Sequence, residues 1–234
     1  MERLTETKIP VKGLWWKLTG LVLVLYSVIA GLLIDVPQLP VIHQSIRNLF
    51  YHVCMWFGMF VMYGTALVYS IKYLARYRLE DDLYASGAVY TGLFFGTLGL
   101  LTGMLWAKFT WGDFWTNDPQ LNGAAVSMMA YLAYAVLRSS IDEVAMRARI
   151  SAVYNIFAFM LLVIFLGVLP RLADSSLHPG KGGNSSTMEG LDMTMRMVFW
   201  PAVIGWILIA VWLLTLNVRY RKLKLKIHLN QTQS

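Results

Sequence analysis

The sequence has 234 residues, of which 57% are hydrophobic and 14% are charged. A soluble globular domain carries roughly 25% charged residues, so this composition excludes an ordinary soluble protein and predicts one that lies mostly in a bilayer. The formal net charge of +7 therefore reports on membrane topology and not on nucleic-acid binding. The single cysteine, Cys54, excludes an internal disulfide and any CxxC redox or zinc motif.

Six apolar segments are each long enough to cross the hydrocarbon core, which takes roughly 20 helical residues. They span residues 18–34, 49–71, 83–106, 121–137, 150–169 and 197–218. Each is predicted to be a helix, because unpaired backbone groups are too costly in lipid and the segments lack the alternation of a β-barrel. The first follows a basic N-terminus, as a signal peptide would, but it is too long and has no clear cleavage site. The fold class predicted is therefore all-α, a polytopic membrane protein with one domain over residues 1–234.

The distribution of Lys and Arg predicts the orientation of these helices. The N-terminus, the second and fourth connections and the C-terminal tail together hold 15 of the 20 Lys and Arg residues, and the opposite side holds 5. By the positive-inside rule, both termini are expected in the cytoplasm. The third connection, a Trp-rich loop over residues 105–122, and the fifth, a His-bearing loop over residues 170–196, then lie outside. Gly96, Gly99 and Gly103 in the third segment have the spacing expected for close helix packing.

An aromatic stretch, WAKFTWGDFWTNDPQLN from Trp106 to Asn122, dominates the expected third connection. It contains three tryptophans, two phenylalanines and two carboxylates. Such rings often gather at the membrane interface, so anchoring is one reading of this stretch. The other is a platform for a large, flat, apolar ligand, to which indoles offer broad rigid faces.

The four histidines differ in their sequence context. His228 lies in the basic tail and His43 in the first outer connection, and both are expected to be surface residues. His52 lies near the outer end of the second helix, where an ionisable group is costly and marks a functional candidate. The alternative for His52 is a ring that hydrogen-bonds a neighbouring helix. His178 lies in the fifth connection and gains weight from its pairing with His52.

Two neutral imidazoles approaching from opposite sides can coordinate a haem iron axially. Zinc fits less well, because it takes three or four protein ligands and Cys54 lies on another face of its helix from His52. Asp113 and Asp118 either orient loop groups or are solvated carboxylates. Packing on the porphyrin would come from Trp106, Trp111 and Trp115, and cations for the propionates from Arg47, Lys108, Arg171 or Arg196.

The stretch WGDFWTND, residues 111–118, resembles the WGxxWxWD signature of the haem-handling membrane proteins of cytochrome c biogenesis. Together with six helices, the Arg47 and Tyr51 frame around His52, and Leu177-His178-x-Gly180, the chain resembles the cytochrome c maturation protein C (haem exporter protein C) family. Asn117 departs from the signature, which has Trp at this position. Ala107, where the family often has Gly, is a milder departure.

The resemblance implies a haem b carrier and not an enzyme. His52 and His178 match the axial ligands, and the Trp-rich loop, including Asp118, matches the external haem platform. Arg47 is the first choice for a propionate contact and Arg196 the second. The family's partners are a membrane-anchored haem chaperone that captures haem, the subunits of an ABC-type transporter and a very small membrane protein. Its location is the bacterial inner membrane, with the haem site on the periplasmic side.

Helix periodicity adds an expectation about the second helix. Residues spaced by three and four share a face, so His52 and Trp56 are expected on the inward side. Trp56, Phe60 and Tyr63 would then form the floor of the haem site, although for Tyr63 ordinary helix packing is the favoured interpretation.

Two other functions stay open from the sequence. One is a cytochrome c synthetase-like subunit that itself attaches haem to apocytochrome c. The other is a small-solute transporter, but transporters usually keep charged residues near the bilayer midplane, and the last four predicted helices contain none.

Overall fold

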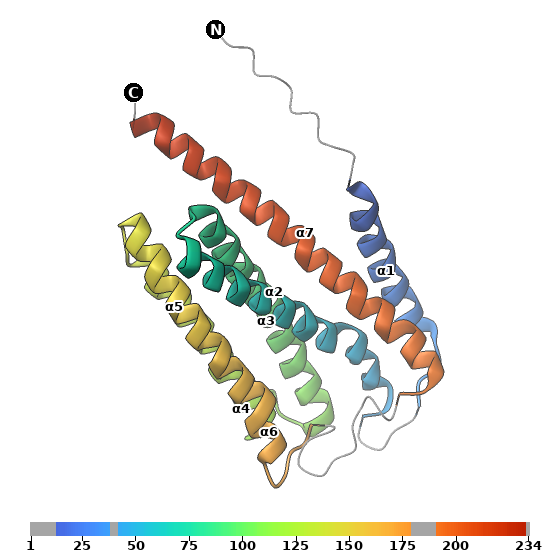
Figure 1. Cartoon of the computed structure of the whole chain (residues 1–234). Coiled ribbons are helices and arrows are strands. Elements are labelled where there is room, and N and C mark those ends of the chain that lie inside the picture. Colours follow the sequence, from blue (N-terminus) through green and yellow to red (C-terminus); the bar gives the residue numbers. More distant parts are fainter. Residues whose placement is uncertain (1–12, 38–41, 179–190, 233–234) are drawn as a thin grey trace.

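The computed structural model describes residues 13–37, 42–178 and 191–232, and within these residues it contains helices and no strand (Figure 1). The predicted all-α membrane fold is thus confirmed, with six helices long and apolar enough to span a membrane. The elements are α1 (Leu14–Leu33), the 3-10 helix η1 (His43–Asn48), α2 (Leu49–Arg76), α3 (Leu79–Trp111), α4 (Pro119–Ser139), α5 (Val144–Leu162), the π-helix η2 (Val163–Val168), α6 (Leu169–Leu172) and α7 (Met193–Thr232).

Most of these helices are longer than the apolar segments that revealed them. The third helix was expected to end at residue 106, yet α3 continues to Trp111. The last was expected over residues 197–218, and α7 covers Met193–Thr232. Apolar composition marks only the part of a helix that sits in hydrocarbon, whereas backbone hydrogen bonding continues into the polar flanks.

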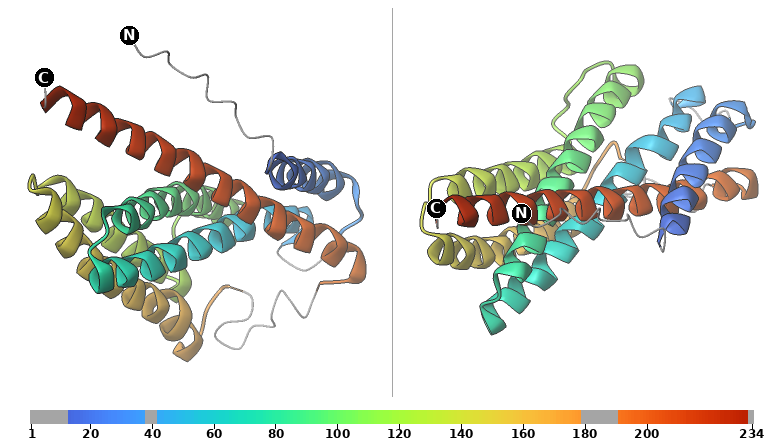
Figure 2. Two further views of the ribbon diagram at one scale, coloured as in Figure 1. Left: turned by 45° about the horizontal axis from the view of Figure 1, so that its top comes forward. Right: turned by 90° about the horizontal axis from the view of Figure 1, so that it is seen from above.

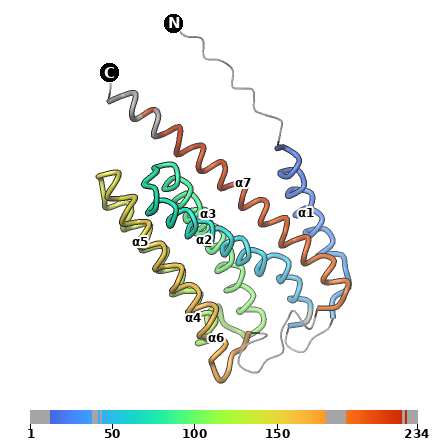
Figure 3. The backbone as a smooth tube through the Cα atoms, in the orientation of Figure 1, coloured from blue at the N-terminus to red at the C-terminus, as the bar shows by residue number. Residues whose placement is uncertain are grey.

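The helices pack around a central α2, which contacts α3, α5 and α7, while α1 lies at one side of the bundle and packs mainly on α7 (Figures 1 and 2). The start of α1 and the end of α7 lie at one end of the bundle (Figure 3). The ends of α1, α3 and α6 lie at the other end. The described helix ends that border the connections predicted to face outward therefore lie together at one end of the molecule.

Glycines on α3 allow α2 to approach closely, as their spacing predicted. A Cβ added at Gly96 would lie 3.0 Å from Met59 Sδ on α2, and one at Gly99 would lie 3.0 Å from the Trp56 ring. At Gly103 the added atom would lie 2.6 Å from His52 Cε1. The smooth face of α3 therefore receives both Trp56 and His52 from α2.

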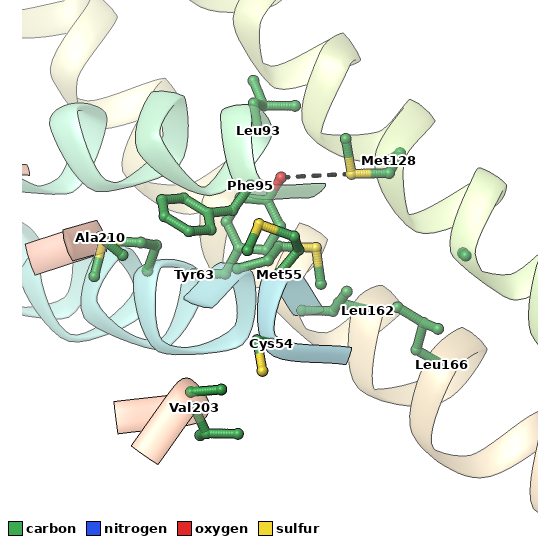
Figure 4. Close-up of a cluster of buried hydrophobic side chains, with 14 of the residues drawn as sticks. Cys54, Met55, Tyr63, Leu93, Phe95, Met128, Leu162, Leu166, Val203 and Ala210 are labelled. Atoms are coloured by element: carbon green, nitrogen blue, oxygen red, sulfur yellow. Dashed lines mark hydrogen bonds between the residues drawn. The ribbon is translucent and has the colours of Figure 1, made fainter. Parts of the chain in front are cut away.

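The middle of the bundle is a closed apolar core (Figure 4). Tyr63 is fully buried there, stacks on Tyr131 with ring centroids 3.4 Å apart, and directs its hydroxyl at Met128 Sδ over 3.9 Å. Cys54 is a buried free thiol in the same cluster, which confirms its interpretation as a packing residue. Phe60 is 38% exposed on the outer surface. The expected aromatic floor is thus wrong for Phe60, and Tyr63 is part of the helix packing.

Candidate functional site

His52 is held on α3 by its Nδ1 atom, which lies 3.0 Å from the Gly99 carbonyl oxygen and 3.2 Å from Thr102 Oγ1. Because a carbonyl only accepts hydrogen bonds, the arrangement assigns the ring proton to Nδ1 and the lone pair to Nε2. The Trp56 indole Nε1–H donates to Nε2 over 3.3 Å. The contact with a neighbouring helix, which was the alternative interpretation of His52, is therefore present. The same contact is the kind that orients a metal-binding histidine.

Two tryptophans near the end of α3 lie against the two candidate histidines. The Trp106 ring meets His52 edge to face with centroids 5.7 Å apart, and its Nε1–H donates to Ser45 Oγ over 2.9 Å. The Trp111 ring meets His178 in the same manner at 5.0 Å. Both tryptophans are helical, so the expectation that they belong to a loop over residues 105–122 is wrong: the connection between α3 and α4 covers only residues 112–118.

His178 is fixed by Asp118, a contact between residues 60 positions apart. The His178 Nδ1 atom lies 2.8 Å from Asp118 Oδ1. Asp118 Oδ2 accepts from Ser176 Oγ at 2.8 Å and from the Leu177 amide at 2.7 Å. The same carboxylate caps α4, because its Oδ1 accepts from the Gln120 amide at 2.8 Å. Asp118 therefore joins the start of α4 to the segment after α6.

The charge state of Asp118 follows from these contacts. Burial of the carboxyl raises its pKa, but the hydrogen bonds from His178, Ser176 and the Leu177 amide outweigh burial and hold the pKa well below its usual range. Its side chain is only 1% exposed, so the reading of Asp118 as a solvated carboxylate is wrong. The Asp-Pro pair at the start of α4 was a local signal for the cap. Nothing local signalled the partner Ser176.

Trp115 has a different neighbourhood from the other two tryptophans. Its Nε1–H donates to Asn122 Oδ1 over 3.3 Å, and Asn122 Nδ2 donates to Asn117 Oδ1 over 2.7 Å. Trp115 is 38% exposed and its neighbour Phe114 is 52% exposed. Asn117, which replaces the signature's Trp, thus takes part in a pair of side-chain hydrogen bonds that connects the loop to Asn122 of α4.

The candidate cations lie at helix ends. Arg47 Nη1 donates to the Gly31 carbonyl at 2.8 Å and Arg47 Nε donates to Gln44 Oε1 at 2.9 Å. Arg196 Nε donates to the Leu191 carbonyl at 2.8 Å, and Lys108 Nζ to the Gly112 carbonyl at 2.6 Å. The propionate contacts of Arg47 and Arg196 stay predictions. The side chains of His43 and His228, and residues Gly180 and Lys181, lie outside what the structure describes.

The candidate metal-binding groups at this end of the bundle are the imidazoles of His52 and His178. Each contacts an acceptor through Nδ1, which leaves Nε2 as the nitrogen that would bind a metal, as in ligand histidines with a second hydrogen bond. In His52 this Nε2 accepts the hydrogen bond from Trp56. In the described residues, no group of three or more His, Cys, Asp and Glu side chains has the geometry to hold a metal ion. The donor set fits a metal whose other ligands come with it, as iron does in haem.

Comparisons with known proteins identify the family of the chain. A family model described as Heme exporter protein C (CcmC) matches residues 4–233. The chain belongs to the haem exporter protein C family. Heme exporter protein C of Bradyrhizobium diazoefficiens is 31% identical over 113 residues, 48% of this chain and 43% of that protein. Its counterpart in Paracoccus denitrificans is 24% identical over 179 residues, 75% of this chain and 72% of that protein.

A second kind of relative is Cytochrome c biogenesis protein CcsA. The Atropa belladonna protein is 24% identical over 159 residues, which cover 65% of this chain and 49% of that protein. The chain thus spans about half the length, or less, of several curated relatives that it matches. Membership of the haem exporter protein C family confirms the resemblance seen in the sequence.

Proposed function

We propose that the chain binds haem b at the end of the bundle where α3 ends, with His52 and His178 as axial ligands, and presents it to a membrane-anchored haem chaperone. One observation carries the proposal: the last turns of α3 bring Trp106 against His52 and Trp111 against His178. Two ligand histidines and two indole rings are thus organised by a single helix end. Haem supplies the iron and the flat apolar ring that such a set of side chains suits.

The protein orients the haem and forms no covalent bond to the porphyrin. The Gly99 carbonyl and Thr102 fix the His52 ring, and the Asp118 carboxylate fixes His178. A carboxylate on Nδ1 also makes the opposite nitrogen a stronger electron donor to a metal. Arg47 and Arg196 would hold the propionates by charge-assisted hydrogen bonds and so set which edge of the porphyrin faces the chaperone.

The location and partners form part of the same proposal. The positive-inside distribution supports cytoplasmic termini and an external, periplasmic haem site in the bacterial inner membrane. The exposed rings of Phe109, Phe114 and Trp115 lie on the last turn of α3 and in the connection that follows it. They offer an apolar surface to the chaperone or the membrane interface. An ABC-type transporter and a small membrane protein complete the proposed system, as the family resemblance implies.

The visible absorption spectrum of the purified protein tests the proposal. Wild-type protein purified from haem-supplied cells is expected to show a Soret band and low-spin reduced peaks, which weaken in His52→Ala and in His178→Ala. His43→Ala is the matched control, because it removes a histidine from the connection before α2 that the proposal does not use. Haem that persists unchanged in both ligand variants would refute the ligand assignment. A wild type without haem would refute haem binding itself.

The match to CcsA proteins favours one second candidate, a synthetase-like subunit that attaches haem to apocytochrome c. The two candidates predict different products when the purified chain is loaded with haem and mixed with reduced apocytochrome c. A synthetase subunit gives haem that stays on the polypeptide after acid and acetone extraction. A delivery protein gives extractable haem until the chaperone is present.

A further inference from the structure

The Nε2 atom of His52 already has a partner in the protein. Trp56 lies one helical turn further along α2, and its indole Nε1–H donates to Nε2 over 3.3 Å. The proton that would let Nε2 act as a donor is on Nδ1, which faces the Gly99 carbonyl and Thr102. The Trp56 indole therefore points at the lone pair through which His52 would bind iron.

The indole is held in this position by packing as well as by the hydrogen bond. Gly99 leaves room for its ring, since a Cβ there would lie 3.0 Å from Trp56 Cε2. One turn further along α3, Gly103 leaves room for the His52 ring. The two rings meet edge to face with centroids 6.1 Å apart and at 82°. Two glycines four residues apart thus seat the Trp56–His52 pair as a unit on α3.

We propose that Trp56 is a latch on His52: a positioning residue that occupies the ligand lone pair in the haem-free protein and must turn away when iron binds. This inference rests on the proposed function, because it assumes that His52 is an axial ligand. One lone pair cannot hold the indole proton and the iron at once, so haem binding breaks a hydrogen bond inside the protein. The cost lowers the affinity for haem, which suits a protein that passes its cargo on.

The first test uses haem binding by the full-length protein in detergent. Trp56→Phe keeps an aromatic ring on Gly99 and removes the N–H, and it is expected to tighten haem binding about two- to tenfold, the range for one neutral hydrogen bond. The low-spin bis-histidine spectrum should remain. Trp206→Phe is the matched control, because its indole nitrogen is buried and has no hydrogen-bond partner in the described part of the chain.

The second test needs no haem and reads the latch directly. The indole N–H signal of Trp56, assigned in a ¹⁵N spectrum by its loss in Trp56→Phe, should shift upfield in His52→Ala and stay in place in His178→Ala. No shift in His52→Ala would mean that the Trp56 N–H does not bind His52. If the signal shifts, the haem titration then decides whether the hydrogen bond opposes iron.

The outcomes separate the latch from the proposed function. Tighter binding in Trp56→Phe, together with the shifted indole signal, supports the latch. If wild type binds haem through His52 but Trp56→Phe binds it equally or more weakly, or if the indole signal ignores His52→Ala, the latch is refuted and the proposed function stands. If wild type takes up no haem, the proposed function fails and the latch fails with it.

Discussion

Asp118 shows how much one carboxylate can organise. It accepts hydrogen bonds from the first turn of α4 and from the segment that carries His178. The first task needs only an oxygen at the helix start, which Asn supplies nearly as well as Asp. The second gathers three donors around a buried carboxylate, where a charged acceptor is worth more than a neutral one. The two tasks can therefore be separated by substitution.

Asp118→Asn is expected to keep the cap of α4 and loosen the segment around His178. Hydrogen bonds to charged groups contribute about 1.5–3 kcal/mol, so the free energy of unfolding in detergent should fall by about that amount. Hydrogen exchange at residues 174–178 should accelerate. Asp113→Asn is the control, since Asp113 is exposed in the same connection. Equal effects of the two substitutions would contradict the role given to Asp118.

Gly103 sets the position of His52 by having no side chain. In Gly103→Ala the new methyl group would lie 2.6 Å from His52 Cε1, so the ring must move away from Gly99 and Thr102. Overpacking of this kind costs about 1–3 kcal/mol, and chemical denaturation should show that loss. Gly64→Ala provides the comparison, because a Cβ there meets nothing within 4 Å and should stabilise α2 by up to about 1 kcal/mol. A neutral Gly103→Ala would argue against the tight seat of His52.

At the scale of the helices, the sequence predicted the number of membrane spans and the shared face of His52 and Trp56 better than it predicted where each helix ends. Hydropathy found six spans because lipid demands long apolar helices. It missed the extension of α3 to Trp111, since Lys108 and Thr110 interrupt the apolar run but do not break a helix. The pairing of His52 with Trp56 followed from their spacing on one helix. The glycine spacing marked Gly99 as a packing position, but its hydrogen bond to His52 and that of Ser176 to Asp118 join different elements and left no sign in the sequence.

An ion pair joins the start of α3 to the end of α4 at the end of the bundle away from His52. Arg138 donates to both oxygens of Asp82 at 2.8 and 2.6 Å, and both side chains are buried. Removing one partner leaves a buried charge uncompensated. Asp82→Asn should therefore lower the free energy of unfolding by about 3–5 kcal/mol in denaturant titrations.

Two further variants test whether the loss of stability in Asp82→Asn comes from the uncompensated charge of Arg138. The charge-free double variant Asp82→Leu with Arg138→Met should be more stable than Asp82→Asn alone. Glu80→Gln breaks the Glu80–Lys222 contact at 2.6 Å, where both side chains are more than 40% exposed, and should change stability little because solvent screens the pair. A double variant that is weaker than the single one would mean that the pair contributes net stability.

For the molecule as a whole, the two candidate histidines could be singled out from the sequence, but the residues around them could not. The even number of spans and the apolar patterning were enough to predict that the first, third and fifth connections share one side, and the bundle has this arrangement (Figure 1). The aromatic stretch was expected to act as one platform. In the structure it divides, with Trp106 and Trp111 against the histidines and Trp115 in contact with Asn122. The end of α3 at Trp111 decides this division, because Trp115 lies in the connection beyond it, and composition does not report where a helix ends.

The side of the membrane on which this end lies is the last prediction. The excess of Lys and Arg at the opposite end predicts that the connection between α3 and α4 is external and that between α4 and α5 is cytoplasmic. Asp113 and Ser140 are exposed residues in these two connections, and the native Cys54 is buried and serves as an unreactive background. In intact cells, a membrane-impermeant maleimide should label Asp113→Cys and leave wild type and Ser140→Cys unlabelled. Ser140→Cys should react only after the membrane is permeabilised. The reverse pattern would put both candidate ligands at the cytoplasmic surface and would contradict the proposed transfer of haem to a chaperone on the periplasmic side.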